Sequence, residues 1–183
     1  MTKLVARQRH TAFGLSVRQL DVAIVDDDTL MLKFASAVLE RMGVARVRVF
    51  TNPIQAFKAM ADDPPNLVMV DWMMKPVDGC VLLRRMRLVS SAPLCFVPAI
   101  MASARATKAF VDKALVAGAH QIIAKPMLEQ SIVVRAHSII DDGRVFILSD
   151  DRYIIDGALP TAADLRMGPA DEFFERETTR WAI

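Results

Sequence analysis

The sequence of 183 residues is poor in the residue types that build thiol and histidine metal centres, with two cysteines and three histidines. Cys80 and Cys95 show no pairing pattern, and His10, His120 and His137 show no metal-ligand spacing. Both thiols are therefore predicted to be reduced core residues, which is typical of a cytoplasmic protein.

Long apolar runs are also missing. Asp71, Lys75 or an arginine interrupts each candidate before it reaches the length that spans a bilayer. The basic N-terminus lacks the apolar region of a signal peptide. We expect a soluble protein without membrane contact, located in the cytoplasm.

Charge of one sign is concentrated nowhere in the middle of the chain, and the formal net charge is only +2. Residues 1–20 hold four basic groups and no acid, whereas residues 143–183 hold five basic and eight acidic groups. Such a chain lacks the positive face that nucleic-acid binding by counterion release needs, so no DNA partner is expected. Residues 1–20 are predicted to be a solvated, poorly ordered basic arm.

What the chain does have is a high apolar fraction, 53%, which supports a sizeable core. Short β-rich apolar runs alternate with stretches of helical period over residues 21–142, which predicts a parallel sheet covered on both faces. The predicted strands are Val22–Val25, Arg46–Phe50, Leu67–Val70, Phe96–Ala102 and Gln121–Ala124. The second alternates arginine and valine, so it is placed at an edge.

Five helices are predicted between and after these strands, with Asn52 as one N-cap and Pro53 in the first turn that follows. The prediction is an α/β fold of five βα units, a doubly wound five-stranded parallel sheet. Its divisions are an arm (1–20), the sheet domain (21–142) and a tail (143–183). In such sheets function lies beside the carboxyl ends of the strands.

Chemistry-bearing residues follow four of the predicted strands: Asp26-Asp27-Asp28, Asp71, Ser103 and Lys125-Pro126. Each alone is an ordinary cap or turn residue. Together, three carboxylates from adjacent strand ends repel one another unless a cation is shared, and a hard divalent ion such as Mg²⁺ suits oxygen ligands. A neighbouring hydroxyl and ammonium add hydrogen-bond donors for a phosphoryl group.

These motifs resemble the receiver domain of two-component response regulators, in its stand-alone type and with the flavodoxin-like sheet order. Asp26-Asp27 resembles the acidic pair of the family, and Asp71 with Met74 and Asp78-Gly79 resembles its phosphoacceptor loop. Residues 98–104 resemble its hydroxyl-bearing strand and residues 117–126 its lysine motif. The resemblance covers residues 21 to about 142, and order, spacing and strand-end placement agree.

The resemblance implies that Asp71 accepts a phosphoryl group from a phosphohistidine on a partner histidine kinase or phosphotransferase. Asp27 and Asp71 are then direct Mg²⁺ ligands, Met73 contributes its backbone carbonyl, and Asp26 acts mainly through a bound water. A receiver catalyses its own phosphorylation and slow dephosphorylation. It is not expected to turn over a separate substrate, so the sequence leaves open whether it counts as an enzyme.

Lys125 is implied to pair with the phosphoryl oxygens, with a cis peptide bond to Pro126, and Ser103 to hydrogen-bond the phosphoryl group once formed. Asp71, Lys125 and Ser103 are thus the catalytic set. The implied output is a switched interaction with a downstream target protein or a relay of phosphate, with a homodimer as a further option. Such a switch needs two conformers, and phosphorylation shifts the population only toward the conformer that makes better contacts with the phosphoryl group.

The sequence departs from the family pattern at one switch position and in one loop, and two further residues occupy its tuning positions. Ile122 stands three residues before the lysine, where the family usually has the aromatic ring of its switch. Lys75 stands where proline is common in the family, and Pro76 follows one position later. We therefore expect the loop after Asp71 to take a different direction without loss of the site residues. Met73 and Arg105 occupy the positions that tune loss of the phosphoryl group, and they predict slow self-dephosphorylation.

Two other interpretations remain open at this point. A phosphohydrolase of the haloacid dehalogenase type would use Asp26 as nucleophile and Asp28 as acid/base, but a cap domain and a late acidic pair are missing. A degenerate receiver acting as a scaffold is disfavoured because no acid, hydroxyl or lysine of the site has been lost.

The tail, residues 143–183, is too short for the DNA-binding output domains common in the family. Residues 144–155 weakly resemble a short extended tail. Phe173, Phe174 and Trp181 follow on a predicted last helix, and they either dock on the chain's own receiver or contact a partner.

Overall fold

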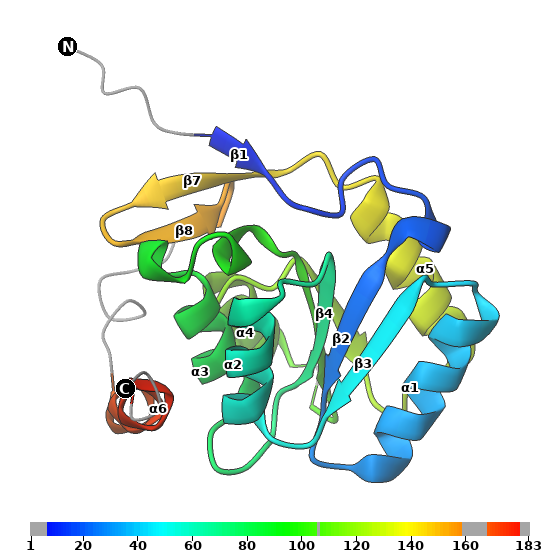
Figure 1. The fold of residues 1–183 in the computed structure, drawn as a ribbon, viewed down its shortest axis with the longest axis horizontal. Coiled ribbons are helices and arrows are strands. Elements are labelled where there is room, and N and C mark those ends of the chain that lie inside the picture. The colour runs from blue at the N-terminus through cyan, green and yellow to red at the C-terminus, as the bar shows by residue number, and fades with distance from the viewer. Residues whose placement is uncertain (1–6, 106, 159–167, 180–183) are drawn as a thin grey trace.

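A computed structural model describes residues 7–105, 107–158 and 168–179, and at its centre lies a five-stranded parallel sheet (Figure 1). The strands lie in the spatial order β3-β2-β4-β5-β6. In chain order they are β2 (Asp21–Val25), β3 (Arg46–Phe50), β4 (Leu67–Asp71), β5 (Ala99–Ser103) and β6 (Gln121–Ala124). The predicted doubly wound sheet is confirmed.

Helices cover both faces of the sheet. On one face lie α1 (Thr29–Arg41) and α5 (Glu129–Ile140); on the other lie α2 (Pro53–Asp62), α3 (Gly79–Met86) and α4 (Lys108–Val116). Two apolar clusters, one on each side of the sheet, form the core. Because strands covered on both faces bury every side chain, β4 and β5 are apolar almost throughout.

Local sequence signals account for the ends of several elements. Asn52 caps α2 by accepting hydrogen bonds from the backbone N–H groups of Ile54 and Gln55, and Pro53 occupies the first turn, as predicted. The arginine–valine alternation of β3 does mark an edge strand, which among the described strands pairs only with β2.

The start predicted for the fourth strand of the parallel sheet was wrong. Residues Leu94–Phe96 form a 3₁₀ turn, and β5 begins only at Ala99. Pro93 begins this turn, and its carbonyl accepts a hydrogen bond from the Phe96 N–H. The Phe96 ring packs instead on Tyr153, with ring centroids 4.6 Å apart.

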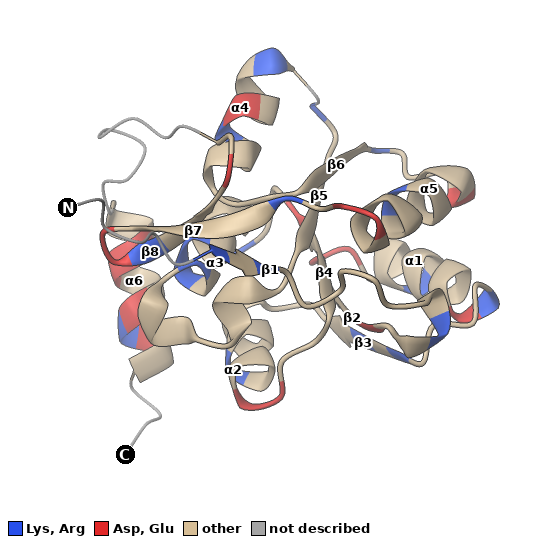
Figure 2. Cartoon of the chain, turned by 90° about the horizontal axis from the view of Figure 1, so that it is seen from above, with Lys and Arg blue, Asp and Glu red and all other residues tan. Residues whose placement is uncertain are grey.

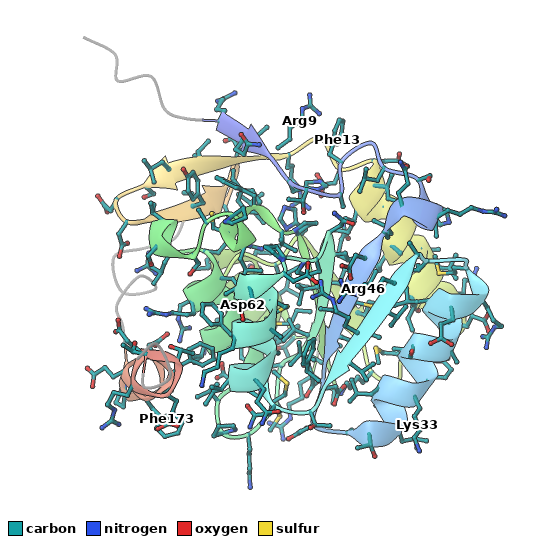
Figure 3. The ribbon with its side chains drawn as sticks, in the orientation of Figure 1. Arg9, Phe13, Lys33, Arg46, Asp62 and Phe173 are labelled. Carbon is teal, nitrogen blue, oxygen red and sulfur yellow. The ribbon has the colours of Figure 1, made fainter. Side chains whose placement is uncertain are left out.

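The prediction of a poorly ordered arm was also wrong for residues 7–20. Strand β1 (Arg7–Arg9) pairs antiparallel with β7 (Val145–Ser149), which forms a hairpin with β8 (Arg152–Ile155). The Arg9 guanidinium lies over the Phe13 ring, 4.1 Å from its centroid (Figure 3). The free edge of β7 pairs with the backbone of β1. The composition of residues 7–20 gives no sign of this distant strand partner.

A buried arginine lies beneath this small sheet. Arg87 is 2% exposed, and its guanidinium donates hydrogen bonds to the backbone carbonyls of Cys95, Val97 and Gly118. The Phe146 ring of β7 covers the guanidinium at 4.7 Å from the ring centroid. Burial lowers the pKa of Arg87 to about 9, so the charge persists at neutral pH and needs these acceptors.

The helix α6 (Pro169–Thr179) packs against α2 and α3. Phe174 is fully buried and meets the Phe57 ring edge-on, with centroids 5.4 Å apart. Arg84 of α3 holds Asp171 through two hydrogen bonds of 3.0 and 2.9 Å. Phe173 and Phe174 therefore pack on the chain's own sheet domain rather than pointing into solvent, while Trp181 lies outside the described residues.

Lysine and arginine residues are spread over many elements rather than gathered on one, and aspartate and glutamate residues lie among them (Figure 2). In the part of the chain that the structure describes, every helix falls short of the length and apolar character needed to cross a bilayer.

We predict that Phe146→Ala lowers the free energy of unfolding by about 3 kcal/mol, because it leaves a cavity and uncovers the Arg87 guanidinium. Leu148→Ala on the same strand is the control, since Leu148 is 40% exposed and should cost under about 1 kcal/mol. Urea unfolding measures both. Equal losses would show that Phe146 has no special role.

Candidate functional site

Polar residues from four neighbouring strands meet at the carboxyl edge of the sheet. Asp26 follows β2, Asp71 ends β4, Ser103 ends β5 and Lys125 follows β6. These strands are adjacent in the sheet in that order, so parallel pairing brings their ends together. The topology therefore assembles the group that the sequence predicted.

Lys125 is the centre of the site. Its Nζ lies 2.7 Å from Oδ2 of Asp26 and 2.8 Å from Oδ1 of Asp71. Burial lowers the pKa of the ammonium, but the bonds to the two carboxylates outweigh this effect and leave it raised. Lys125 thus stays charged and is held between the two strand ends. Its peptide bond to Pro126 is cis, as predicted.

Asp71 is buried, with 6% of its surface exposed. Burial raises the pKa of its carboxyl, the bond from Lys125 lowers it, and the nearby Asp26 raises it again, with a net rise. Its Oδ2 accepts a hydrogen bond of 3.1 Å from the Met73 N–H. Ionised Asp71 is therefore costly to the folded state without a further cation.

A third carboxylate completes an acidic cluster. Asp26, Asp27 and Asp71 each offer an oxygen, and these oxygens lie within 4.8 Å of one another. Asp27 is exposed and accepts a hydrogen bond of 3.3 Å from the Lys75 N–H. Three carboxylates face one ammonium, so a hard divalent cation such as Mg²⁺ fits this donor set.

Asp28 has a different role from its two neighbours. Its carboxylate accepts hydrogen bonds from the N–H groups of Leu30 and Met31 and thereby caps α1. The carboxylate that the hydrolase interpretation needs as acid/base is thus used as a helix cap.

Ser103 lies beside the cluster and is 3% exposed. Its Oγ accepts a hydrogen bond of 3.1 Å from the Arg105 N–H, and its carbonyl accepts one of 2.8 Å from the Lys125 N–H. Arg105 and Met73 are exposed, and their backbone N–H groups bind Ser103 and Asp71. The backbone carbonyl of Met73 remains a predicted ligand only.

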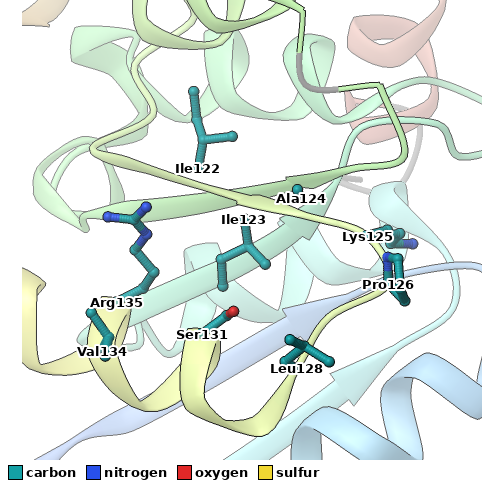
Figure 4. Close-up of a pocket in the computed structure, with 9 residues that line it drawn as sticks. All are labelled: Ile122, Ile123, Ala124, Lys125, Pro126, Leu128, Ser131, Val134 and Arg135. Atoms are coloured by element: carbon teal, nitrogen blue, oxygen red, sulfur yellow. The ribbon is translucent and has the colours of Figure 1, made fainter.

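Ile122 does not join the cluster. It lies on β6, on the face opposite Ile123, and lines a surface groove that continues past Leu128 to Arg135 of α5 (Figure 4). Ile122 packs against the core cluster that contains Phe110, and Trp72 packs against the same cluster.

Two contributors to the site were missed in their structural roles. A Cβ added to Gly79 would lie 2.2 Å from the backbone oxygen of Asp71, so only glycine allows α3 to start this close to β4. Trp72 contacts Phe110 at the start of α4, with ring centroids 4.7 Å apart. The sequence did offer a sign of the Trp72 contact, since an aromatic residue directly follows Asp71.

Comparison with known proteins agrees with this geometry. A family model described as the response regulator receiver domain matches residues 22–137. The chain belongs to this receiver family. Receiver domains of this family generally bind Mg²⁺, and the cluster of Asp26, Asp27 and Asp71 is the acidic group that the structure shows.

Curated relatives include the transcriptional regulatory protein CseB of Streptomyces coelicolor, 32% identical over 122 residues, which covers 67% of this chain and 50% of that protein. The phosphate regulon transcriptional regulatory protein PhoB of Pseudomonas aeruginosa is 27% identical over 119 residues, covering 65% and 51%. The chain thus spans about half the length of these relatives. They support a two-component response regulator and give no support to a hydrolase.

Solved structures agree on the fold. A putative response regulator from Chloroflexus aurantiacus superposes with a TM-score of 0.61 at 26% identity, covering 68% of this chain and 99% of that one. The chemotaxis response regulator CheY4 of Vibrio cholerae has a TM-score of 0.61 at 17% identity, covering 66% and 98%. The second likeness concerns the fold alone.

We predict that Asp71→Asn makes this receiver more stable at neutral pH, by about 1 kcal/mol without Mg²⁺. The folded-state pKa of Asp71 is raised, so its ionisation costs stability above that pKa and nothing below the unfolded value. The advantage of Asp71→Asn should therefore shrink as pH falls toward the unfolded value.

Urea unfolding between pH 7 and pH 4 measures this difference. Asp62→Asn on α2 is the matched control, because Asp62 is exposed and its replacement should have little effect. A gap between Asp71→Asn and wild type that stays constant across this range would contradict the prediction.

Proposed function

We propose that this receiver accepts a phosphoryl group on Asp71 from a phosphohistidine of a histidine kinase or phosphotransferase. The observation that carries the proposal is Lys125, held by Asp26 and Asp71 beside a third carboxylate, Asp27. An ammonium fixed next to a buried carboxylate provides charge for incoming phosphoryl oxygens.

In the proposed step, a carboxylate oxygen of Asp71 attacks phosphorus. A P–O bond forms as the P–N bond to the donor imidazole breaks, and the leaving nitrogen keeps the electron pair and takes up a proton. Lys125 keeps its proton and pairs with a phosphoryl oxygen. The product is an acyl phosphate on Asp71, which water later hydrolyses to release phosphate.

Asp27 and Asp71, with the Met73 carbonyl, would hold Mg²⁺ directly, and Asp26 would act through a water molecule. When bound, this ion supplies positive charge that balances the charge on the phosphoryl oxygens. The raised pKa of Asp71 supports this assignment, because the buried carboxylate lacks enough positive charge from Lys125 alone.

Ser103 would act as the switch residue. Its Oγ now accepts a hydrogen bond from the Arg105 N–H, and a phosphoryl group on Asp71 offers the hydroxyl hydrogen a strong acceptor. A conformer with Ser103 turned inward gains this bond, and the population shifts toward it.

A protein is the favoured phosphodonor. Leu30, Met73 and Leu128 follow the acidic pair, the phosphoacceptor and the lysine, and they are 67%, 66% and 63% exposed. Large apolar side chains that are exposed close in sequence to the site residues favour docking of a protein there. The proposed output is a downstream target protein or phosphate relay, in the cytoplasm, without DNA or membrane contact; a homodimer is a further arrangement to test.

Incubation of the protein with acetyl phosphate and Mg²⁺ should place one hydroxylamine-labile phosphoryl group on Asp71, located by mass spectrometry after borohydride reduction. Asp71→Asn should remove the label. Label on Asp26 with turnover of phosphate monoesters would support the hydrolase instead.

Two neighbouring carboxylates provide a matched comparison for the metal dependence of labelling. Asp27→Asn should reduce labelling at limiting Mg²⁺ by about tenfold or more, whereas Asp28→Asn removes the same charge but keeps the α1 cap. Equal effects of the two substitutions would argue against a metal site at Asp27.

The phosphoryl group should be lost slowly, because the side chain at position 73 is an exposed methionine that cannot orient an attacking water. Met73→Asn supplies an amide there and should speed decay of the acyl phosphate by about tenfold. The loss of label after removal of acetyl phosphate gives the rate, and an unchanged lifetime would contradict the assigned role.

A further inference from the structure

We propose that Trp72 and Phe110 form an aromatic relay that transmits the state of Asp71 to α4. The inference rests on the proposed phosphorylation of Asp71 and adds the route by which that event moves a surface helix. Neither residue contacts the phosphoryl group in this scheme; both are positioning residues.

The backbone of Trp72 is fixed where three elements meet. Its N–H donates a hydrogen bond of 2.9 Å to the Ala102 carbonyl, next to Ser103, and its carbonyl accepts one of 2.9 Å from the Gly79 N–H at the start of α3. Trp72 also lies directly between Asp71 and Met73, whose N–H binds the Asp71 carboxylate. A rearrangement of that carboxylate therefore acts on the peptide units flanking the indole.

The indole passes such a change on to α4. Its ring packs edge-on against Phe110, with centroids 4.7 Å apart and ring planes at 65°. Phe110 lies in the first turn of α4 and, with Ala114, makes up the buried residues of that helix. The ring contact is thus a large part of the anchorage of α4, and a tilt of the indole requires the helix to repack.

A second connection from the site reaches the same turn. The Arg105 N–H binds Ser103 Oγ, and two residues further on Thr107 caps α4 through its Oγ1, which accepts from the Phe110 N–H at 3.3 Å. If Ser103 turns toward a phosphoryl group, the Arg105 N–H loses this acceptor. Backbone and ring contacts therefore converge on Phe110.

Ile122 is a weaker candidate for this role. It is half-buried and aliphatic, and it packs against the same core cluster as Trp72 and Phe110. A β-branched side chain has few rotamers and no planar surface, so its movement displaces little volume. Among the described residues, the aromatic contact between the site and α4 is the one from Trp72.

Hydrogen exchange of α4 amides, residues 108–116, before and after phosphorylation of the full chain with acetyl phosphate and Mg²⁺ tests the relay. We expect exchange to change by about fivefold or more in the wild type. The change should persist in Trp72→Phe, which keeps a ring, and fall below about twofold in Trp72→Leu and Phe110→Leu. Phe57→Leu removes a ring that pairs with α6 and should respond like the wild type.

The label on Asp71 is measured in the same samples. Label without an α4 response in the wild type, or an undiminished response in labelled Phe110→Leu, would overturn the relay and leave the proposed function intact. Absence of label in the wild type would overturn the proposed function and the relay with it.

Discussion

The salt bridges of Lys125 to Asp26 and Asp71 are the constraint on which the rest of this receiver depends. Two buried carboxylates on neighbouring strands repel each other, and the ammonium from a third strand offsets that repulsion. Next to this pair, α3 starts against the Asp71 backbone, where a Cβ in place of the Gly79 hydrogen would lie 2.2 Å from the Asp71 oxygen. With Asp27 added, negative charge still exceeds positive charge, so the donor set fits a hard divalent cation.

The opposite edge of the sheet carries contacts that stabilise the fold. The Arg87 guanidinium donates to backbone carbonyls and is covered by Phe146, while β1 adds a third strand to the hairpin of β7 and β8. On the α2–α3 side, α6 adds Phe174 to the core. The acidic cluster and these stabilising contacts thus lie in different parts of the molecule, and the packing offsets the electrostatic cost of the cluster.

Much of the fold could be predicted because its signals are local. Buried parallel strands are short apolar runs, and Asn52 with Pro53 marks a helix start within three residues. The predictions failed where a distant partner decides. Phe96 is apolar enough for a strand, but it lies in a turn that begins at Pro93. Its ring packs against the Tyr153 ring, which lies far along the chain. Residues 7–20 carry only basic composition, and their order depends on β7, far along the chain.

For the site, the sequence by itself determined which residues end the strands or directly follow them, and parallel pairing makes those residues neighbours: Asp26, Asp71, Ser103 and Lys125. Tertiary structure alone decided the different roles of Asp27 and Asp28. Asp28 caps α1 because the helix starts directly after it, whereas the Asp27 carboxylate joins the cluster. It also decided that Trp72 reaches Phe110, since ring contacts between a strand end and a later helix follow from packing, which no local pattern encodes.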